Sequence, residues 1–352
     1  MIMEKYTMKK YVSLALILVI SCCPLFANDK DTLNVFTWSE YIPSDVLADF
    51  TKETGIKVVV STFESNEAMY AKLKLLGGKG YDIVMPSSYF IERLYKDNLL
   101  ARLDKSKIIG LNNLAPESLG HSFDPHNDYS IPYMWGALGL LFNKKVVDPT
   151  VITSFNDLNR PEFKGRVLLS DDMRDTFGVA LKVRGYSVNT TNPDEIKAGY
   201  EWLQQLKPEI RVFDITATKQ AFIGEEVLAG ISWNGDAFIA MKENPNLQFI
   251  FPKEGFILWI DNFSILNQSE NKENAYAFIN FLLRPEIAKR CVEEFFYTTP
   301  NIAGRKLLDP IYQENPIIFP NDGVMSKGEL ISNIGNAINI YTSYWEKLKM
   351  SH

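Results

Sequence analysis

Residues 32–86 read TLNVFTWSEYIPSDVLADFTKETGIKVVVSTFESNEAMYAKLKLLGGKGYDIVMP, and strand-like and helix-like stretches alternate along them. Short apolar runs predict three strands, at Thr32–Phe36, Lys57–Val60 and Tyr81–Met85. Between these runs, helices are predicted over Asp45–Thr54, which ends at Gly55, and over Asn66–Leu76, which ends at Gly77-Gly78. This βαβαβ order predicts an α/β fold in which helices cover both faces of a parallel sheet.

The rest of the chain continues this alternation. Strands are predicted at Leu138–Phe142, Arg166–Leu169, Val227–Ser232, Leu247–Phe251 and Asn262–Leu266. Helices are predicted near Thr176–Arg184, Asp194–Leu206, Asn271–Leu283, Pro285–Phe295 and Lys327–Lys349. A chain of 352 residues exceeds one comfortable hydrophobic core, and no flexible linker interrupts it. We therefore expect two domains joined by short strand-like crossings.

Polar and aromatic residues follow the first and third predicted strands. Ligands of parallel α/β sheets bind beyond the carboxyl ends of the strands. Trp38-Ser39-Glu40-Tyr41 follows the first strand, and Ser87-Ser88-Tyr89 follows the third. These two segments are therefore candidates for one binding site.

An indole two residues before a carboxylate occurs twice in the chain. Trp38 precedes Glu40, and Trp259 precedes Asp261, by this spacing. In an extended backbone residues i and i+2 point to the same side, so each pair can offer an aromatic face and a negative charge to an aliphatic ammonium ion. The alternative is a core or rim tryptophan beside a solvated charge, and the spacing alone leaves it open.

Composition excludes several classes of partner and cofactor. The net charge is −6 and no basic block is present, so nucleic acid is not an expected partner. The histidines His121, His126 and His352 have no metal-site spacing, and neither a metal nor a cofactor is expected. Cys291 is the only cysteine far from the N-terminus, which predicts a buried helix residue and no internal disulfide.

The N-terminus predicts export. Lysines precede the apolar run Tyr11–Ile20, which is shorter than the roughly 20 residues of a membrane span and ends at Ser21-Cys22-Cys23. Val19-Ile20-Ser21-Cys22 resembles a bacterial lipoprotein signal, so residues 1–21 are predicted to be a lipoprotein signal peptide and Cys22 the lipidated residue. Cys23 is the next candidate, and an ordinary signal peptide cut after Ala27 is the alternative. The predicted location is periplasmic, with a lipid anchor in a bacterial membrane.

The chain resembles a known family in several dense stretches. They are Phe50–Val58, Met69–Lys74, Phe123–Pro125, Asn127–Tyr133 and Asn280–Pro285, and they are similar to the periplasmic polyamine-binding proteins of ABC transporters, the spermidine/putrescine-binding group. The resemblance implies a two-lobed type II periplasmic binding protein. Each lobe would hold a mixed, mainly parallel sheet flanked by helices, with a cleft between the lobes. The N-terminal lobe would comprise residues 31–138 and 260–308, and the C-terminal lobe residues 139–259 and 309–352.

The same resemblance implies the ligand contacts. An aromatic box falls on Trp38, Tyr41, Trp233, Trp259 and Tyr297, acidic ligands on Glu40, Asp172, Asp175 and Asp261, and further polar contacts on Ser39, Ser87 and Tyr89. It implies a receptor that closes its lobes on putrescine or spermidine and delivers it to the permease subunits of an ABC transporter. We expect it to act as a monomer.

Two positions depart from the spermidine-binding pattern. Asp175 stands where the family has Glu, and Ile331 stands where it has a Gln that helps to hold the aminopropyl end. An Ile side chain cannot hydrogen-bond an amine. The departures predict that putrescine is preferred to spermidine.

Enzymes and other receptors are the alternatives to a polyamine receptor. The chain shows no Gly-x-Ser-x-Gly, no His-Glu-x-x-His and no P-loop, and no enzyme activity is expected. A receptor of the same fold for another small cationic solute remains an alternative. A surface sensor or adhesin that uses the same cleft is a further one.

Overall fold

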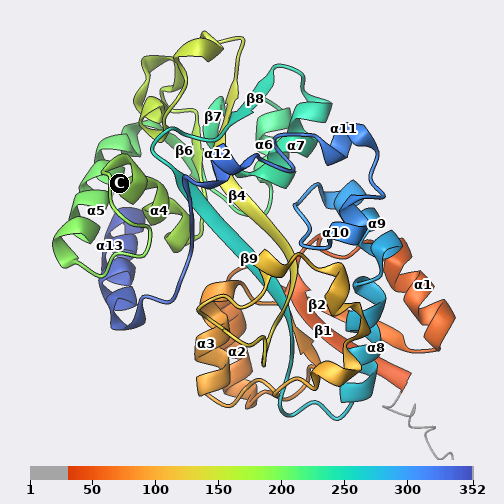
Figure 1. Ribbon diagram of the computed structural model, residues 1–352. Coiled ribbons are helices and arrows are strands. Elements are labelled where there is room, and N and C mark those ends of the chain that lie inside the picture. The colour runs from red at the N-terminus through yellow and green to blue at the C-terminus, as the bar shows by residue number, and fades with distance from the viewer. Residues whose placement is uncertain (1–30, 351–352) are drawn as a thin grey trace, which may run out of the picture.

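The structure is a computed structural model that describes residues 31–350 (Figure 1). The predicted βαβαβ unit is present: β1 (Thr32–Trp38) pairs in parallel with β2 (Lys57–Phe63) and with β3 (Ile83–Val84). The connecting helices are α1 (Ser44–Thr54) and α2 (Asn66–Leu76). Gly55 and Gly77 end them in the left-handed conformation, with φ of 75° and 61°, as their positions predict.

Two long antiparallel strands connect the two halves of the molecule. They are β4 (Ile131–Asn143) and β9 (Phe256–Ile265), which run side by side through its centre in Figure 1. One end of β9 pairs with β3, and its other end pairs with β10 (Gly328–Leu330). The strand order is β2-β1-β3-β9-β4-β7-β5-β6, with β10 on β9 and β8 on β4. The α/β class with a mixed sheet is as predicted.

The second half of the sheet surrounds the C-terminal end of β4. There β4 pairs with β7 (Ala229–Trp233) and β8 (Leu247–Ile250), while β5 (Val167–Leu169) lies in parallel between β7 and β6 (Ile210–Phe213). Helices α4 (Met173–Val183), α5 (Pro193–Leu206) and α13 (Ile338–Met350) pack together, and α6 (Thr218–Ile223) packs on α7 (Asn234–Glu243). In Figure 1 these two groups lie on opposite sides of the strands.

The first half of the sheet is covered in the same way. Helix α3 (Ser88–Lys96) contacts α2, and α8 (Lys272–Leu282) contacts α9 (Pro285–Phe295) and β1. Three one-turn helices follow: α10 (Ile302–Arg305), α11 (Pro310–Gln313) and α12 (Asp322–Met325). Short 3-10 helices occupy Lys105–Lys107, Ile109–Asn113, Pro116–Ser118, Pro149–Val151, Phe155–Asn159, Pro161–Phe163, Lys207–Glu209 and Gly335–Ala337. The largest apolar cluster runs from Phe36 of β1 to Phe177 of α4, so apolar packing is continuous between the halves.

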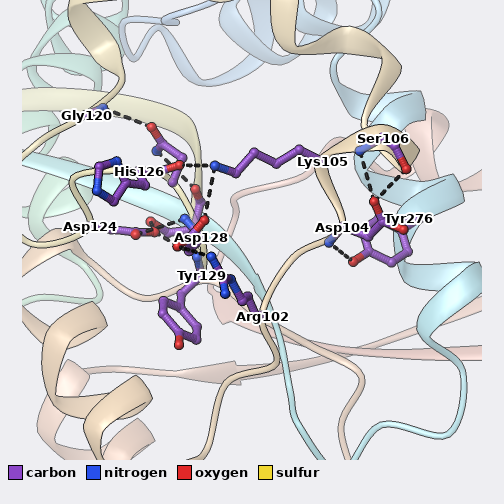
Figure 2. A network of polar contacts seen from close by, with 12 residues as sticks. Arg102, Asp104, Lys105, Ser106, Gly120, Asp124, His126, Asp128, Tyr129 and Tyr276 are labelled. Atoms are coloured by element: carbon purple, nitrogen blue, oxygen red, sulfur yellow. Dashed lines mark hydrogen bonds and ion pairs between the residues drawn. The ribbon is translucent and has the colours of Figure 1, made fainter.

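Two of the stretches that resemble the family, Phe123–Pro125 and Asn127–Tyr133, form a polar network that holds a loop in place (Figure 2). The buried carboxylate of Asp124 accepts hydrogen bonds from the backbone N–H groups of Asp128 and Tyr129, each at 2.9 Å, and from the Ser130 hydroxyl at 2.7 Å. Asp128 pairs with Arg102 at 3.0 Å and Lys105 at 3.1 Å. None of these side chains lines the cavity described below. Ion pairs at the surface contribute little to stability. The hydrogen bonds to Asp124 fix the loop that leads into β4.

Several predicted bounds are wrong. The helix predicted over Lys327–Lys349 is instead β10 followed by α13, which begins only at Ile338. Gly335, with φ of 54°, belongs to the intervening 3-10 turn. The strand predicted at Asn262–Leu266 begins at Phe256, so Trp259 lies inside a strand. The strand predicted at Leu138–Phe142 begins at Ile131, so the prediction covers only the second half of β4. β4 is buried along almost its whole length.

Candidate functional site

One cavity lies between the two halves of the molecule, and residues from both line it. Its wall includes all twelve predicted ligand contacts: Trp38, Ser39, Glu40, Tyr41, Ser87, Tyr89, Asp172, Asp175, Trp233, Trp259, Asp261 and Tyr297. These residues end or follow β1, lie at the starts of α3 and α4, end β7, lie in β9, or follow α9. The structure thus brings the twelve together, and their contact with a ligand stays a prediction.

Among the carboxylates that line the cavity, Asp261 is the most enclosed. It lies in β9, two residues after Trp259, and both side chains reach the cavity, as the alternation of a strand requires. Its carboxylate accepts hydrogen bonds from the Ser87 hydroxyl at 2.6 Å and from the Tyr41 hydroxyl at 2.8 Å. Burial raises the pKa of Asp261 to about 7, against the opposing effect of these two bonds. An ammonium ion beside it would favour the ionised form.

The side chains around Asp261 are themselves fixed by hydrogen bonds. Asn66 accepts from the backbone N–H of Ser87 at 3.0 Å, and its amide donates to the Ser87 hydroxyl and to the Tyr89 hydroxyl, each at 3.1 Å. Tyr133 donates to the backbone carbonyl of Tyr41 at 3.0 Å. Asn66 lines the cavity and was missed from the sequence, because nothing local distinguishes an asparagine at the start of a helix.

Asp172 and Asp175 form a second acidic group at the start of α4. Asp172 caps this helix, accepting from the N–H groups of Arg174 at 2.7 Å and Asp175 at 3.0 Å. Asp175 is buried and accepts from the indole N–H of Trp233 at 3.2 Å. Burial and the neighbouring Asp172 charge raise the pKa of Asp175 well above its ordinary value. Burial also raises the pKa of Asp172, although the two helix N–H groups oppose it. A cation between these two acids would relieve their repulsion.

Glu40 does not follow the geometry predicted for it. An extended backbone would place its side chain beside Trp38, but Glu40 has a left-handed backbone with φ of 48° and lies in a bend after β1. Its side chain is 67% exposed and pairs with Lys219 at 2.6 Å. The i, i+2 prediction is therefore right for Trp259 and Asp261 and wrong for Trp38 and Glu40, because only the first pair lies within a strand.

Aromatic side chains line the same cavity as the acidic groups. The rings of Trp259 and Tyr297 meet edge to face at 5.1 Å, and those of Tyr41 and Tyr297 at 6.3 Å. Trp38 packs on Phe63 at 4.5 Å. The indole N–H groups of Trp38 and Trp259 are buried and have no hydrogen-bond partner. Aromatic faces beside carboxylates suit the methylenes and the charge of an aliphatic ammonium ion.

Three charged residues of the cavity were missed from the sequence: the exposed Glu64, Asp236 and Lys219. Asp236 lies in the first turn of α7, three residues after Trp233, and Lys219 lies on α6. Lys219 contacts Asp236 at 3.4 Å as well as Glu40. The proximity of Asp236 to Trp233 was a usable signal. A single lysine in a short helix carries none, because its partners come from elements distant in the sequence. Ile331 also lines the cavity, in agreement with the resemblance.

Residues 45–320 match the model of the bacterial extracellular solute-binding protein family. The chain belongs to the bacterial extracellular solute-binding proteins. A spermidine/putrescine-binding periplasmic protein of Salmonella typhimurium is 46% identical over 92% of this chain and 93% of its own.

Solved structures of this family share the fold. The spermidine/putrescine ABC transporter substrate-binding protein of Streptococcus pneumoniae has a TM-score of 0.79 and 37% identity, over 91% of this chain and 99% of its own. A lipoprotein of Treponema pallidum has a TM-score of 0.81 and 28% identity, over 90% and 99%. The predicted two-lobed binding-protein fold is thereby confirmed. The prediction that the chain is no enzyme is confirmed too, because the family is one of solute-binding proteins.

Membership also bears on location. The family is extracellular, and a periplasmic relative agrees with the predicted export. Within residues 31–350 no helix has the length and apolar character needed to cross a membrane. The same part of the chain holds no group of three or more His, Cys, Asp or Glu residues placed to bind a metal ion. Cys22, Cys23 and the predicted signal peptide lie outside the described residues.

Proposed function

We propose that this protein is a polyamine receptor of an ABC transporter. It binds putrescine and spermidine by lobe closure, prefers putrescine, and delivers its ligand to permease subunits. The observation that carries the proposal is the presence of buried carboxylates and tryptophans on one cavity wall, above all Asp261 beside Trp259. The spermidine/putrescine-binding relative and the transporter protein of Streptococcus pneumoniae support the ligand class and the role in transport.

The charge pattern supports a ligand with spaced ammonium groups. A buried cation is costly unless its hydration is replaced by carboxylates and hydrogen bonds. Asp261 and the Asp172–Asp175 pair provide two such places, and aromatic side chains line the same cavity. An extended diamine has its two charges at its ends and methylenes between them, and two acidic groups with aromatic walls suit such a ligand.

Lobe closure is supported by the origin of the wall residues. A ligand favours a closed state only if it contacts both lobes in that state. We propose that the N-terminal lobe comprises residues 31–138 and 260–308, and the C-terminal lobe residues 139–259 and 309–352. With these bounds Ser87 and Asp261 belong to one lobe, and Asp172 and Asp175 to the other. A ligand that bridges them would hold the lobes together, and exclusion of water would strengthen each ion pair.

The preference for putrescine is supported by Ile331. This side chain is buried on the cavity wall, and its backbone is held by the Leu258 carbonyl at 2.9 Å. An aminopropyl nitrogen placed against Ile331 would lose its hydration without gaining a hydrogen bond. Putrescine lacks this third nitrogen.

Calorimetric titration of the chain from residue 31 onward, stripped of ligand by unfolding and refolding, tests the proposal. Putrescine, cadaverine, spermidine and spermine are compared in one buffer. We expect saturable binding of putrescine and spermidine, with the smaller dissociation constant for putrescine. Absence of binding for all four overturns the polyamine assignment and leaves a receptor for another small cationic solute, or a sensor or adhesin, as the function.

Anchoring is the second part of the proposal. We propose that Cys22 is lipidated and tethers the receptor to a membrane, as the short apolar run before it suggests and as a lipoprotein relative supports. In cells, Cys22→Ala should move the protein from the detergent phase to the aqueous phase, while Cys23→Ala should not. Unchanged partitioning of the Cys22 variant contradicts the assignment.

A further inference from the structure

The cavity contains a charged group of the wrong sign for a cation receptor. Of the described residues that line it, Lys219 is the only lysine or arginine. Its side chain is 15% exposed, and its Nζ lies 2.6 Å from Oε2 of Glu40 and 3.4 Å from Oδ1 of Asp236. Glu40 follows β1 and Asp236 begins α7, so this ammonium group joins elements of the two proposed lobes.

Apart from the exposed Glu64, the carboxylates of the cavity form three groups with different partners. Asp261 is held by Ser87 and Tyr41, and Asp175 by Trp233 beside Asp172. The third group, Glu40 with Asp236, is the one that holds Lys219. Three acidic groups match the three nitrogens of a triamine. In one of the three, the protein itself already supplies an ammonium group, Lys219.

We propose that Lys219 is a specificity-determining residue whose ammonium occupies the Glu40–Asp236 group and so excludes a third ammonium of the ligand. The inference rests on the proposed polyamine function and deepens it. Asp261 and the Asp172–Asp175 pair remain for the ligand, and two acidic groups are the number that a diamine needs. A longer polyamine must either displace Lys219 or leave one of its nitrogens without a carboxylate.

The electrostatics of Lys219 support a permanent charge. Burial lowers the pKa of its ammonium, but the charges of Asp236 and Glu40 outweigh burial and leave the pKa raised. Asp236 is in turn buried, which raises the pKa of its carboxyl, and Lys219 and a hydrogen bond from Tyr297 oppose that shift. Removal of the ammonium would leave Asp236 as an enclosed acid without a cation. A ligand nitrogen could then take the vacant place.

The test compares three variants with the wild type. Lys219→Met keeps the length of the side chain and removes its charge, whereas Lys219→Arg keeps the charge. Lys182→Met is a matched control, because Lys182 is 13% exposed and pairs with Glu329 at 2.6 Å outside the cavity. Dissociation constants are measured by calorimetry for putrescine, for spermidine and for N-propylputrescine, which has nearly the length of spermidine but one ammonium fewer.

We expect Lys219→Met to lower the spermidine dissociation constant at least tenfold relative to that of putrescine. Affinity for N-propylputrescine should not gain, because it has no third charge to place. Lys219→Arg and Lys182→Met should keep the wild-type ratio. If Lys219→Met does not fold, as judged by thermal unfolding, Lys219→Gln takes its place with the same expectation.

The outcomes separate this inference from the proposed function. Wild-type protein that binds polyamines, with an unchanged ratio in the charge-removing variant, overturns the role of Lys219 and leaves the receptor function standing. An equal gain for spermidine and N-propylputrescine also overturns it, because the effect would then be one of space. Wild-type protein that binds none of the three ligands overturns both proposals.

Discussion

The hydroxyl of Ser87 donates a 2.6 Å hydrogen bond to the carboxylate of Asp261, although 174 positions separate the two residues in the sequence. An isolated antiparallel bridge joins their backbones as well. The start of α3 and the middle of β9 are thereby locked together at the cavity wall. Asp261 is thus held in position by the protein's own contacts, and a side chain fixed in this way loses little entropy on binding.

Asp261→Asn should weaken putrescine binding strongly. The variant keeps the shape of the side chain and removes its charge, so the ligand ammonium loses its buried partner at a cost of roughly 2–5 kcal/mol. Calorimetry measures the change. Asp171→Asn is the control, because Asp171 pairs with Lys349 at 2.6 Å, is 43% exposed and does not line the cavity. A loss of less than tenfold for Asp261→Asn would place this carboxylate outside the ligand contacts.

Ligand binding should depend on pH near neutrality. Burial raises the pKa of Asp261 from 3.8 to about 7, and a bound ammonium favours the ionised form. Binding near pH 7 should therefore release protons, and affinity should fall as the pH drops below about 7. Calorimetry in buffers of different ionisation enthalpy detects the protons. The Asp261→Asn variant should release fewer, and equal release in both proteins would contradict the assignment.

The same shift has the opposite consequence for the ligand-free protein. An acid with a raised pKa in the folded state binds a proton more tightly there than in the unfolded chain. The contribution of Asp261 to the free energy of unfolding is therefore present at pH 4 and is lost as the pH rises to about 7. Denaturant unfolding across this range should show a steeper decline for the wild type than for Asp261→Asn. Putrescine should reduce the decline, because it stabilises the ionised form.

Ile331→Gln should shift the preference toward spermidine. The glutamine amide offers hydrogen-bond groups that Ile331 lacks. The backbone should stay in place, because Leu258 accepts from the N–H of Ile331 at 2.9 Å and Ser88 donates to its carbonyl at 3.3 Å. The ratio of the two dissociation constants should move by about tenfold. Ile215→Gln makes the same change elsewhere on the cavity wall and should leave the ratio unaltered. Spermidine binding ten times tighter than putrescine in the wild type would already refute the predicted preference.

Local signals explain which elements were predictable from the sequence. The helices that end at Gly55 and Gly77 were predictable because each stop is a left-handed glycine next to the last apolar turn. β10 was not, because Gly328–Leu330 is a short strand that forms only by pairing with β9. A continuous helix was predicted through it, but pairing with β9 makes these residues a strand.

The site residues differ in the same way: those placed by a local pattern were predictable from the sequence, and those placed by distant contacts were not. Trp259 and Asp261 share a face because they lie in one strand, so two-residue spacing sufficed. Glu40 also lines the cavity, but its backbone is left-handed, so the two-residue spacing from Trp38 does not place the two side chains on one face of a strand. Lys219 meets Glu40 across 179 positions, and no local pattern encodes that contact. Resemblance to the family supplied most of the predicted contacts. The position of Lys219 in the cavity became visible only in the fold.

Gly136→Ala should damage the cavity from behind its wall. Gly136 of β4 is paired with Trp259 of β9, and an added Cβ would lie 2.4 Å from Cζ2 of the indole and 2.7 Å from Oδ1 of Asn234. Neither neighbour moves freely, because the Trp259 ring packs on Tyr297 and Asn234 accepts from the N–H of Ala137 at 3.1 Å. Overpacking of this kind costs about 1–3 kcal/mol of folding free energy.

The effect on binding distinguishes this glycine from one that matters only for stability. Displacement of the Trp259 ring should weaken putrescine binding by about tenfold, since one aromatic wall contact contributes on the order of 1 kcal/mol or more. Tryptophan fluorescence on titration should change as well. Gly199→Ala on α5 is the control: its nearest neighbour would be Leu181 at 3.3 Å, far from the lining residues. Wild-type affinity in a destabilised Gly136→Ala protein would show that the Trp259 indole is not a ligand contact, and it would weaken the case for the aromatic box as a whole.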